Sequence, residues 1–180
     1  MKRILFIAGL LLIAIVVGFA MENIKVNINY ILERGGAIPG FFEQDFETKR
    51  IWLDGKRILT PFDYYYNHQR IEWLFNLTES ELMRLKWFNS LFFTGVFMLI
   101  NGTLMFVITR DREFFRWTAL FYAIFFSLSF FIFLIGKMTG TLSNAYGVSR
   151  KIAGALQSLV PLMILLPASW LVRKHNAGIL

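Results

Sequence analysis

The chain contains no cysteine, only two histidines and only four prolines among its 180 residues. Without cysteine it cannot form a disulfide framework, a thiolate metal site or a cysteine nucleophile. Charged residues make up 17% of the chain and hydrophobic residues 56%, which excludes the polar composition of a disordered protein. The aromatic share is 17%, and the mean hydropathy is +0.53. This composition is typical of an integral membrane protein.

Four apolar runs carry most of this hydrophobic content, and none of them contains Asp, Glu, Lys or His: 4–21, 87–108, 117–135 and 152–172. Each has at least 18 residues, enough to cross about 30 Å of hydrocarbon at about 1.5 Å per helical residue. We therefore expect an all-α membrane protein with a four-transmembrane-helix bundle. Proton relays and ion sites place ionisable groups inside the spans, so their absence here argues against a pump or a proton-coupled transporter.

The spans divide the chain into three parts. Residues 1–21 form the first transmembrane helix, residues 22–86 an extracytoplasmic insert, and residues 87–180 transmembrane helices 2 to 4. Lys2 and Arg3 precede the first apolar run, and Gly18 and Ala20 are small residues at possible cleavage positions. We expect an uncleaved anchor, with a cleaved signal peptide as the alternative.

Basic residues on the short flanks indicate the orientation in the membrane. Seven lie on one side, Lys2, Arg3, Arg110, Arg112, Arg116, Arg173 and Lys174, against three on the other, Lys137, Arg150 and Lys151. The positive-inside rule then places both termini in the cytoplasm and residues 22–86 in the periplasm of a bacterial inner membrane. The high pI of about 9.9 reflects this topology and contact with anionic membrane lipids, and we expect no nucleic-acid partner.

The insert carries signals for strands. Apolar residues alternate with polar ones over 24–30, which predicts a half-buried strand, although Ile24, Ile28 and Ile31 would also share one face of a helix. The glycines and the proline of 35–40 then break the chain. Segments 49–53 and 56–60 flank Asp54-Gly55, a dipeptide that favours a tight hairpin. The sequence thus predicts a small strand-containing insert between helices 1 and 2.

A helix start follows the insert. Thr78-Glu79-Ser80-Glu81 fits a capping box, in which the threonine hydroxyl and the glutamate satisfy free amides at a helix start. This predicts a helix that runs unbroken from residue 78 into the second span. Asn76-Leu77-Thr78 also matches a glycosylation sequon, which is the competing interpretation.

Inside the spans, the clearest pattern is small residues spaced four apart. Such residues let helix backbones approach closely, and we expect them at helix contacts: Ala14 and Gly18, then Ala119, Ala123 and Ser127, then Gly154 and Ser158. Gln157 is the most polar residue deep in the fourth span, and Pro161 follows it. We expect a kinked helix whose Gln157 amide bonds to a neighbouring helix, with a substrate-facing notch as the alternative.

An aromatic and polar patch in the insert supplies the interface candidates: Trp52, Asp63, Tyr64, Tyr65, Tyr66 and His68. Tyrosines of this kind anchor at a membrane surface or contact a partner protein. Acid or base chemistry by Asp63 and His68 is the alternative. We expect no catalytic residues, no metal and no cofactor, and therefore no enzyme.

The fourth span shows a family resemblance. Ser149-Arg150-Lys151-Ile152, Leu156-Gln157-Ser158-Leu159-Val160-Pro161-Leu162 and Leu165-Leu166-Pro167-Ala168 resemble the last helix of small exosortase-associated integral membrane proteins of the Bacteroidetes. Pro61-Phe62-Asp63, followed by three tyrosines, is similar to their aromatic segment. The resemblance implies an accessory protein beside a separate sorting or processing enzyme.

Together these features predict a non-catalytic accessory or scaffold subunit whose partners are membrane lipids and another integral membrane protein. A membrane protein that binds a lipid or small molecule at Gln157 is the first alternative. A membrane enzyme that uses Asp63 and His68 is the second.

Overall fold

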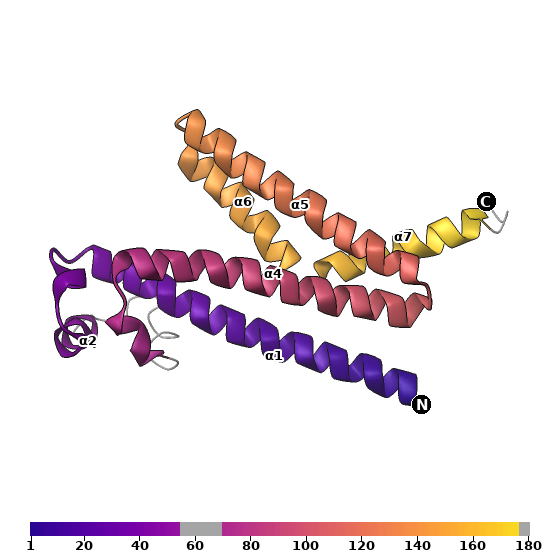
Figure 1. The fold of residues 1–180 in the computed structure, drawn as a ribbon, viewed down its shortest axis with the longest axis horizontal. Coiled ribbons are helices and arrows are strands. Elements are labelled where there is room, and N and C mark those ends of the chain that lie inside the picture. The colour runs from indigo at the N-terminus through magenta and orange to yellow at the C-terminus, as the bar shows by residue number, and fades with distance from the viewer. Residues whose placement is uncertain (55–69, 177–180) are drawn as a thin grey trace. The chain divides into compact units, whose positions relative to one another are not determined.

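A computed structural model of the protein describes residues 1–54 and 70–176 (Figure 1). Its helices are α1 (Lys2–Tyr30), α2 (Phe46–Asp54), α4 (Glu79–Thr109), α5 (Arg112–Met138), α6 (Leu142–Leu156) and α7 (Val160–Asn176). A π-helical turn, Ile31–Gly35, extends α1, and short 3-10 helices lie at Phe41–Glu43 and Glu72–Asn76. The predicted helical class is confirmed. The predicted strands are wrong, because the described residues contain no strand.

The chain forms two compact units. The helical unit consists of Met1–Gly18 and Phe92–Leu180, and the insert unit consists of Phe19–Leu91. Helices α1 and α4 each contribute residues to both units.

The segment 24–30, predicted as a strand, is instead the last two turns of α1. Extending an existing helix adds one hydrogen bond per residue and needs no new nucleus, whereas a strand here would require a partner strand. The competing helical interpretation of Ile24, Ile28 and Ile31 is the correct one. Ile28 and Ile31 are buried in a hydrophobic cluster, and Ile24 packs against that cluster.

The first arm of the predicted hairpin, 49–53, lies in helix α2. Asp45 starts this helix, since its carboxylate accepts hydrogen bonds from the Thr48 N–H at 3.0 Å and the Thr48 hydroxyl at 2.8 Å. Lys49 and Leu53, four residues apart, both point inward, which is helical spacing. The second arm, 56–60, lies outside the described residues.

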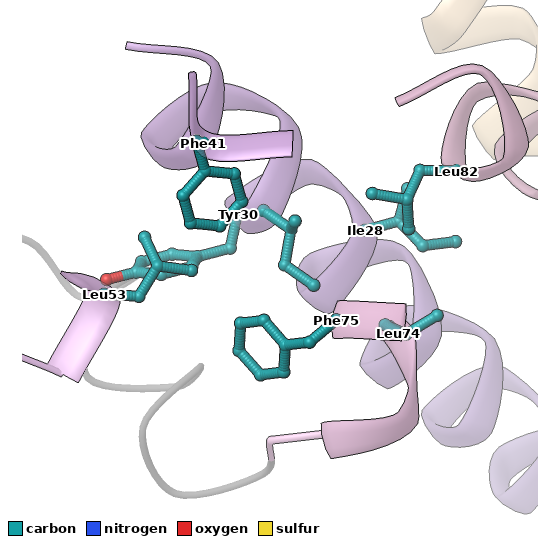
Figure 2. Close-up of a cluster of buried hydrophobic side chains, with 8 residues drawn as sticks. Ile28, Tyr30, Phe41, Leu53, Leu74, Phe75 and Leu82 are labelled. Carbon is teal, nitrogen blue, oxygen red and sulfur yellow. The ribbon is translucent and has the colours of Figure 1, made fainter. Parts of the chain in front are cut away.

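The insert unit has its own hydrophobic core (Figure 2). Side chains from the end of α1, from its π-helical extension, from α2, from the two 3-10 helices and from the start of α4 form it: Ile28, Tyr30, Ile31, Phe41, Leu53, Leu74, Phe75 and Leu82. Gly35 permits this packing, because a Cβ at that position would lie 2.4 Å from the Phe41 ring. The predicted break at 35–40 is confirmed, and Gly40 there has a φ of 71°.

The capping box at the start of α4 is confirmed. The Thr78 N–H donates to the Glu81 carboxylate at 2.8 Å, and the Glu81 N–H donates to the Thr78 hydroxyl at 3.4 Å. From there α4 continues without interruption to Thr109, as the sequence predicts.

Among the residues that the structure describes, three helices are long and apolar enough to cross a membrane: Lys2–Gly35, Glu79–Thr109 and Arg112–Met138. The predicted fourth span is divided into α6 and α7, which meet at a bend of 65° and make a fourth crossing if the pair is counted as one. Most side chains in the apolar windows of the first and third helices are exposed in the isolated chain. Such apolar faces are suited to lipid.

In the helical unit, α5 and α6 lie side by side as an antiparallel pair (Figure 1). Gly136 of α5 makes this approach possible, because a Cβ there would lie 2.0 Å from the Ala145 Cβ of α6. The Ser129 hydroxyl bonds to the Ser149 carbonyl at 3.0 Å and to the Ser149 hydroxyl at 2.8 Å, which joins the same two helices further along. Small and hydroxyl-bearing residues therefore bring these two backbones together.

Candidate functional site

The candidate site is a buried polar cluster at the break between α6 and α7. Helix α6 ends at Leu156, where the Gln157 N–H makes a last helical bond to the Ala153 carbonyl. Pro161 explains the break, since its ring would clash with the Gln157 carbonyl in a continuous helix. As the second residue of α7, Pro161 needs no amide hydrogen there.

Side chains satisfy the carbonyls that the break frees. The Tyr122 hydroxyl of α5 donates to the Leu156 carbonyl at 2.8 Å, and the Asn101 amide of α4 donates to the Ser158 carbonyl at 2.8 Å. Ser158 uses its own hydroxyl to donate to the Ala155 carbonyl at 2.6 Å and to accept from the Val160 N–H at 3.1 Å. A broken helix is tolerated in an apolar environment when neighbouring groups bond to its backbone in this way.

Gln157 extends the cluster to a second point on α4. Its side-chain amide donates to the Thr94 hydroxyl at 3.1 Å, and both residues are buried. The sequence predicts a bond from this amide to a neighbouring helix, and Thr94 on α4 is its partner. Thr94 and Asn101 lie seven residues apart on one face of α4. That face therefore bonds to the Gln157 side chain and to the Ser158 carbonyl, both within the break.

Asn101 is the central residue of the cluster and is 0% exposed. Both of its amide hydrogens are used, one by the Ser158 carbonyl and the other by the Tyr122 hydroxyl at 2.7 Å. The Tyr122 proton goes to the Leu156 carbonyl, so Tyr122 can only accept from Asn101. The amide orientation is thereby fixed. The Asn101 Oδ1 atom is buried without a hydrogen-bond partner in the described part of the chain.

The cluster is neutral, because amides, hydroxyls and backbone carbonyls compose it. It offers one unused buried acceptor, which suits a hydrogen-bond donor and not an anion. Buried polar groups of this kind are otherwise paired, so an unpaired one marks a position where a further donor would be stabilised.

The predicted packing residues of α5 lie beside the face that is actually buried. Ala123 and Ser127 are exposed and Ala119 is half-buried, whereas Thr118, Tyr122, Ser129 and Gly136 are buried. The packing role of Ala119, Ala123 and Ser127 therefore stays a prediction. The larger Tyr122 occupies the contact because its hydroxyl bonds to the broken helix.

The other predicted packing residues differ in their surroundings. Ala14 is buried, and a Cβ on Gly18 would lie 3.7 Å from the Phe97 ring of α4. Gly154 is half-buried, but nothing lies within 4 Å of its Cβ position, so no close approach depends on it. Ser158 belongs to the polar cluster.

Of the predicted interface residues, Trp52 is described. It is half-buried against the core of the insert unit, with its ring 6.4 Å from the Phe41 ring. Asp63, Tyr64, Tyr65, Tyr66 and His68 lie outside the described residues.

Among the described residues of the insert unit, Lys49 is a buried charged side chain, and its ammonium donates to the Phe75 carbonyl at 3.1 Å. Burial lowers the pKa of Lys49 below its ordinary value, and the carboxylate of Asp45 acts in the opposite direction. The hydrogen bonds that Asp45 accepts from Thr48 hold the pKa of that carboxyl below its ordinary value. Lys49 thus fixes the inner face of α2 to the 3-10 helix at Glu72–Asn76.

Sequence reasoning missed Asn101, Tyr122, Thr94 and Lys49. For Asn101 a signal exists, since an asparagine in the middle of an apolar span needs a buried partner. Tyr122 and Thr94 carry no such signal, because both residue types occur freely in membrane helices. Lys49 resembles any surface lysine in the sequence.

Comparison with known proteins gives no relatives: no family model, no curated protein and no solved structure matches the chain. Within residues 1–54 and 70–176, no group of three or more His, Asp or Glu side chains is placed to hold a metal ion.

Proposed function

We propose that this protein is a non-catalytic accessory subunit of a membrane complex, in which the insert unit binds a partner protein. The helices of the helical unit serve as its membrane anchor. The observation that supports this role is that Phe19–Leu91 forms a compact unit with its own core, attached to helices of membrane-spanning length. A tether between two spans would need no such core.

The surface of the insert unit includes apolar side chains suited to a contact. Ile51 of α2 is 65% exposed, because Lys49 and Leu53 occupy the inner face of that helix. Trp73, on the 3-10 helix that packs against α2, is 54% exposed. Tryptophan is enriched among the residues that contribute most to binding at protein interfaces.

The proposal includes the topology that the basic flanks favour. Both termini lie in the cytoplasm, and the insert unit lies on the periplasmic side of a bacterial inner membrane. Its partner is then another integral membrane protein with a periplasmic surface. The resemblance of the fourth span makes an exosortase-like sorting enzyme the first partner to test.

Co-purification tests the role. The tagged full chain, extracted from its own membrane in mild detergent, should retain one membrane protein in a fixed ratio. Ile51→Ser combined with Trp73→Ser should lose that protein, while the control Glu79→Gln, at an exposed position of α4, retains it. Equal recovery from all three samples would contradict the proposed surface.

A second function is favoured by the Asn101 cluster: binding of a small molecule or lipid that carries a hydroxyl or N–H donor. Its donor would satisfy the Asn101 Oδ1 atom, which is otherwise unpaired in the described chain. Native mass spectrometry of the gently extracted protein would then show a bound mass that is lost in Asn101→Leu and retained in Asn144→Ala. A bare chain in every sample would contradict this function.

A further inference from the structure

A groove lies where α4 turns into α5 in the helical unit. Phe106 of α4 and three residues of α5, Arg112, Phe115 and Arg116, line it, and its volume is about 390 Å³. Volumes of roughly 300–1,000 Å³ are usual for ligand sites. The groove combines an apolar side with a cationic side.

Short-range features of the chain build this groove. The turn consists of Arg110 and Asp111, where Arg110 has a φ of 58° and Asp111 caps α5 by accepting from the Glu113 N–H at 3.0 Å. The Phe115 ring packs against the backbone of Gly102, since a Cβ there would lie 2.8 Å from it. Arg112 and Arg116, four residues apart, lie on one face of α5.

The same end of the helical unit gathers further positive charge. Arg3 of α1 donates to the Ile108 carbonyl at 2.6 Å, and Arg173 of α7 donates to the Thr109 carbonyl. These two guanidinium groups are therefore engaged with the last carbonyls of α4. The amino end of α1 and the carboxyl end of α7 thus lie at the α4–α5 turn.

The positive charges of Arg112 and Arg116 in the groove are less neutralised by neighbouring groups. Arg116 pairs with Glu113 at 2.7 Å, but both side chains are exposed, so the pair is weak. Arg112 makes no ion pair or hydrogen bond within the part of the chain that the structure describes. Both arginines lie at the amino end of α5, where the helix dipole is positive and an added anion is stabilised.

We propose that this groove binds an anionic phospholipid. The lipid phosphate lies between Arg112 and Arg116, whose fork of N–H donors matches phosphate oxygens. The start of an acyl chain lies along Phe106 and Phe115. The inference requires insertion into a membrane but not the subunit role, so either can fail without the other.

Native mass spectrometry of the detergent-purified full chain tests the site by titration with phosphatidylglycerol and with phosphatidylcholine of the same acyl chains. We expect one phosphatidylglycerol to bind preferentially. Arg112→Gln with Arg116→Gln should raise its Kd by roughly fivefold for each arginine removed. The control Arg150→Gln with Lys151→Gln removes the same charge from α6 and should leave the Kd unchanged.

Two further samples identify what is recognised. Phe106→Ala keeps every charge and should still weaken phosphatidylglycerol binding, which also covers the case in which the double arginine variant fails to fold. Glycerol 3-phosphate, which has no acyl chain, should not displace the lipid. Equal binding of phosphatidylcholine, an equal loss in the α6 control, or displacement by glycerol 3-phosphate would each overturn the proposal.

Discussion

The buried ammonium of Lys49 donates a hydrogen bond to the main-chain carbonyl of Phe75 over 3.1 Å. This bond links α2 to the 3-10 helix that precedes α4, and the two bonded residues lie 26 positions apart in the insert unit. A lysine in this position carries a desolvation cost that depends on pH, which makes the fold of the insert unit testable by titration.

The first prediction concerns Lys49 and pH. Its pKa is lowered in the folded state, so between that value and the ordinary value near 10.5 the unfolded chain binds more protons than the folded one. The free energy of unfolding must therefore rise with pH in that window. Below the window both states are protonated, and this gain in stability is absent. We expect the Tm of the detergent-solubilised protein to rise toward pH 10.5 relative to Lys49→Met. Parallel pH profiles of the two proteins would show that Lys49 is not buried as a cation.

The second prediction concerns the polar cluster. Tyr122→Phe leaves the Leu156 carbonyl unpaired at the helix break, and Asn101→Ala leaves both the Ser158 carbonyl and the Tyr122 hydroxyl without a donor. Unfolding in mixed detergent should show a loss of about 0.5–2 kcal/mol for Tyr122→Phe and a larger loss for Asn101→Ala. Asn144→Ala, at an exposed position of α6, should change the free energy of unfolding little. If these hydrogen bonds did not stabilise the protein, all three variants would have the same free energy of unfolding.

The third prediction concerns the contact between α5 and α6. Gly136→Ala adds a methyl group where the Ala145 Cβ already lies, so the helices must separate. We expect a destabilisation of about 1–3 kcal/mol. Gly154→Ala is the matched control, because its Cβ position is open and alanine favours the helix. If Gly136→Ala unfolds at the same denaturant concentration as the unmodified protein, the close approach of α5 and α6 does not depend on Gly136.

The fourth prediction concerns topology, and the absence of cysteine makes it simple to test. Single cysteines at Ser80, Asn144 and His175, all exposed, give each protein one reactive thiol. A membrane-impermeant maleimide should label Ser80→Cys and Asn144→Cys from the periplasmic side, and His175→Cys only after the inner membrane is opened. Labelling of His175→Cys in sealed spheroplasts would reverse the proposed orientation.

Much of the helical architecture follows from the sequence, because uninterrupted apolar length, the capping box at Thr78 and the breaker at 35–40 act locally. The strand predictions failed where a local pattern fitted two periods. Apolar and polar residues alternate over 24–30, but the same residues also continue a long helix. Extending that helix costs less free energy than pairing a new strand. At 49–53 the decisive signal lay outside the apolar run, in the cap that Asp45 provides.

The candidate site was predictable only in part. Pro161 and Gln157 mark the break in the sequence, since proline acts on its own turn. The residues of α4 and α5 that bond to the broken helix are set by how each helix is rotated about its axis. The spacing of small residues did not determine that rotation. The buried face of α5 carries Tyr122, the neighbour of the predicted Ala123. A buried asparagine such as Asn101 is the clearest sequence signal of a tertiary hydrogen bond inside an apolar helix.

The central claim is that the insert unit holds this protein in a membrane complex. Native mass spectrometry of the full chain, released directly from its own membrane, tests that claim most directly. We expect a complex of fixed mass that contains one further membrane protein and that dissociates in Ile51→Ser with Trp73→Ser. A lone chain from the unmodified protein, at a detergent strength that preserves known complexes of the same membrane, would contradict it.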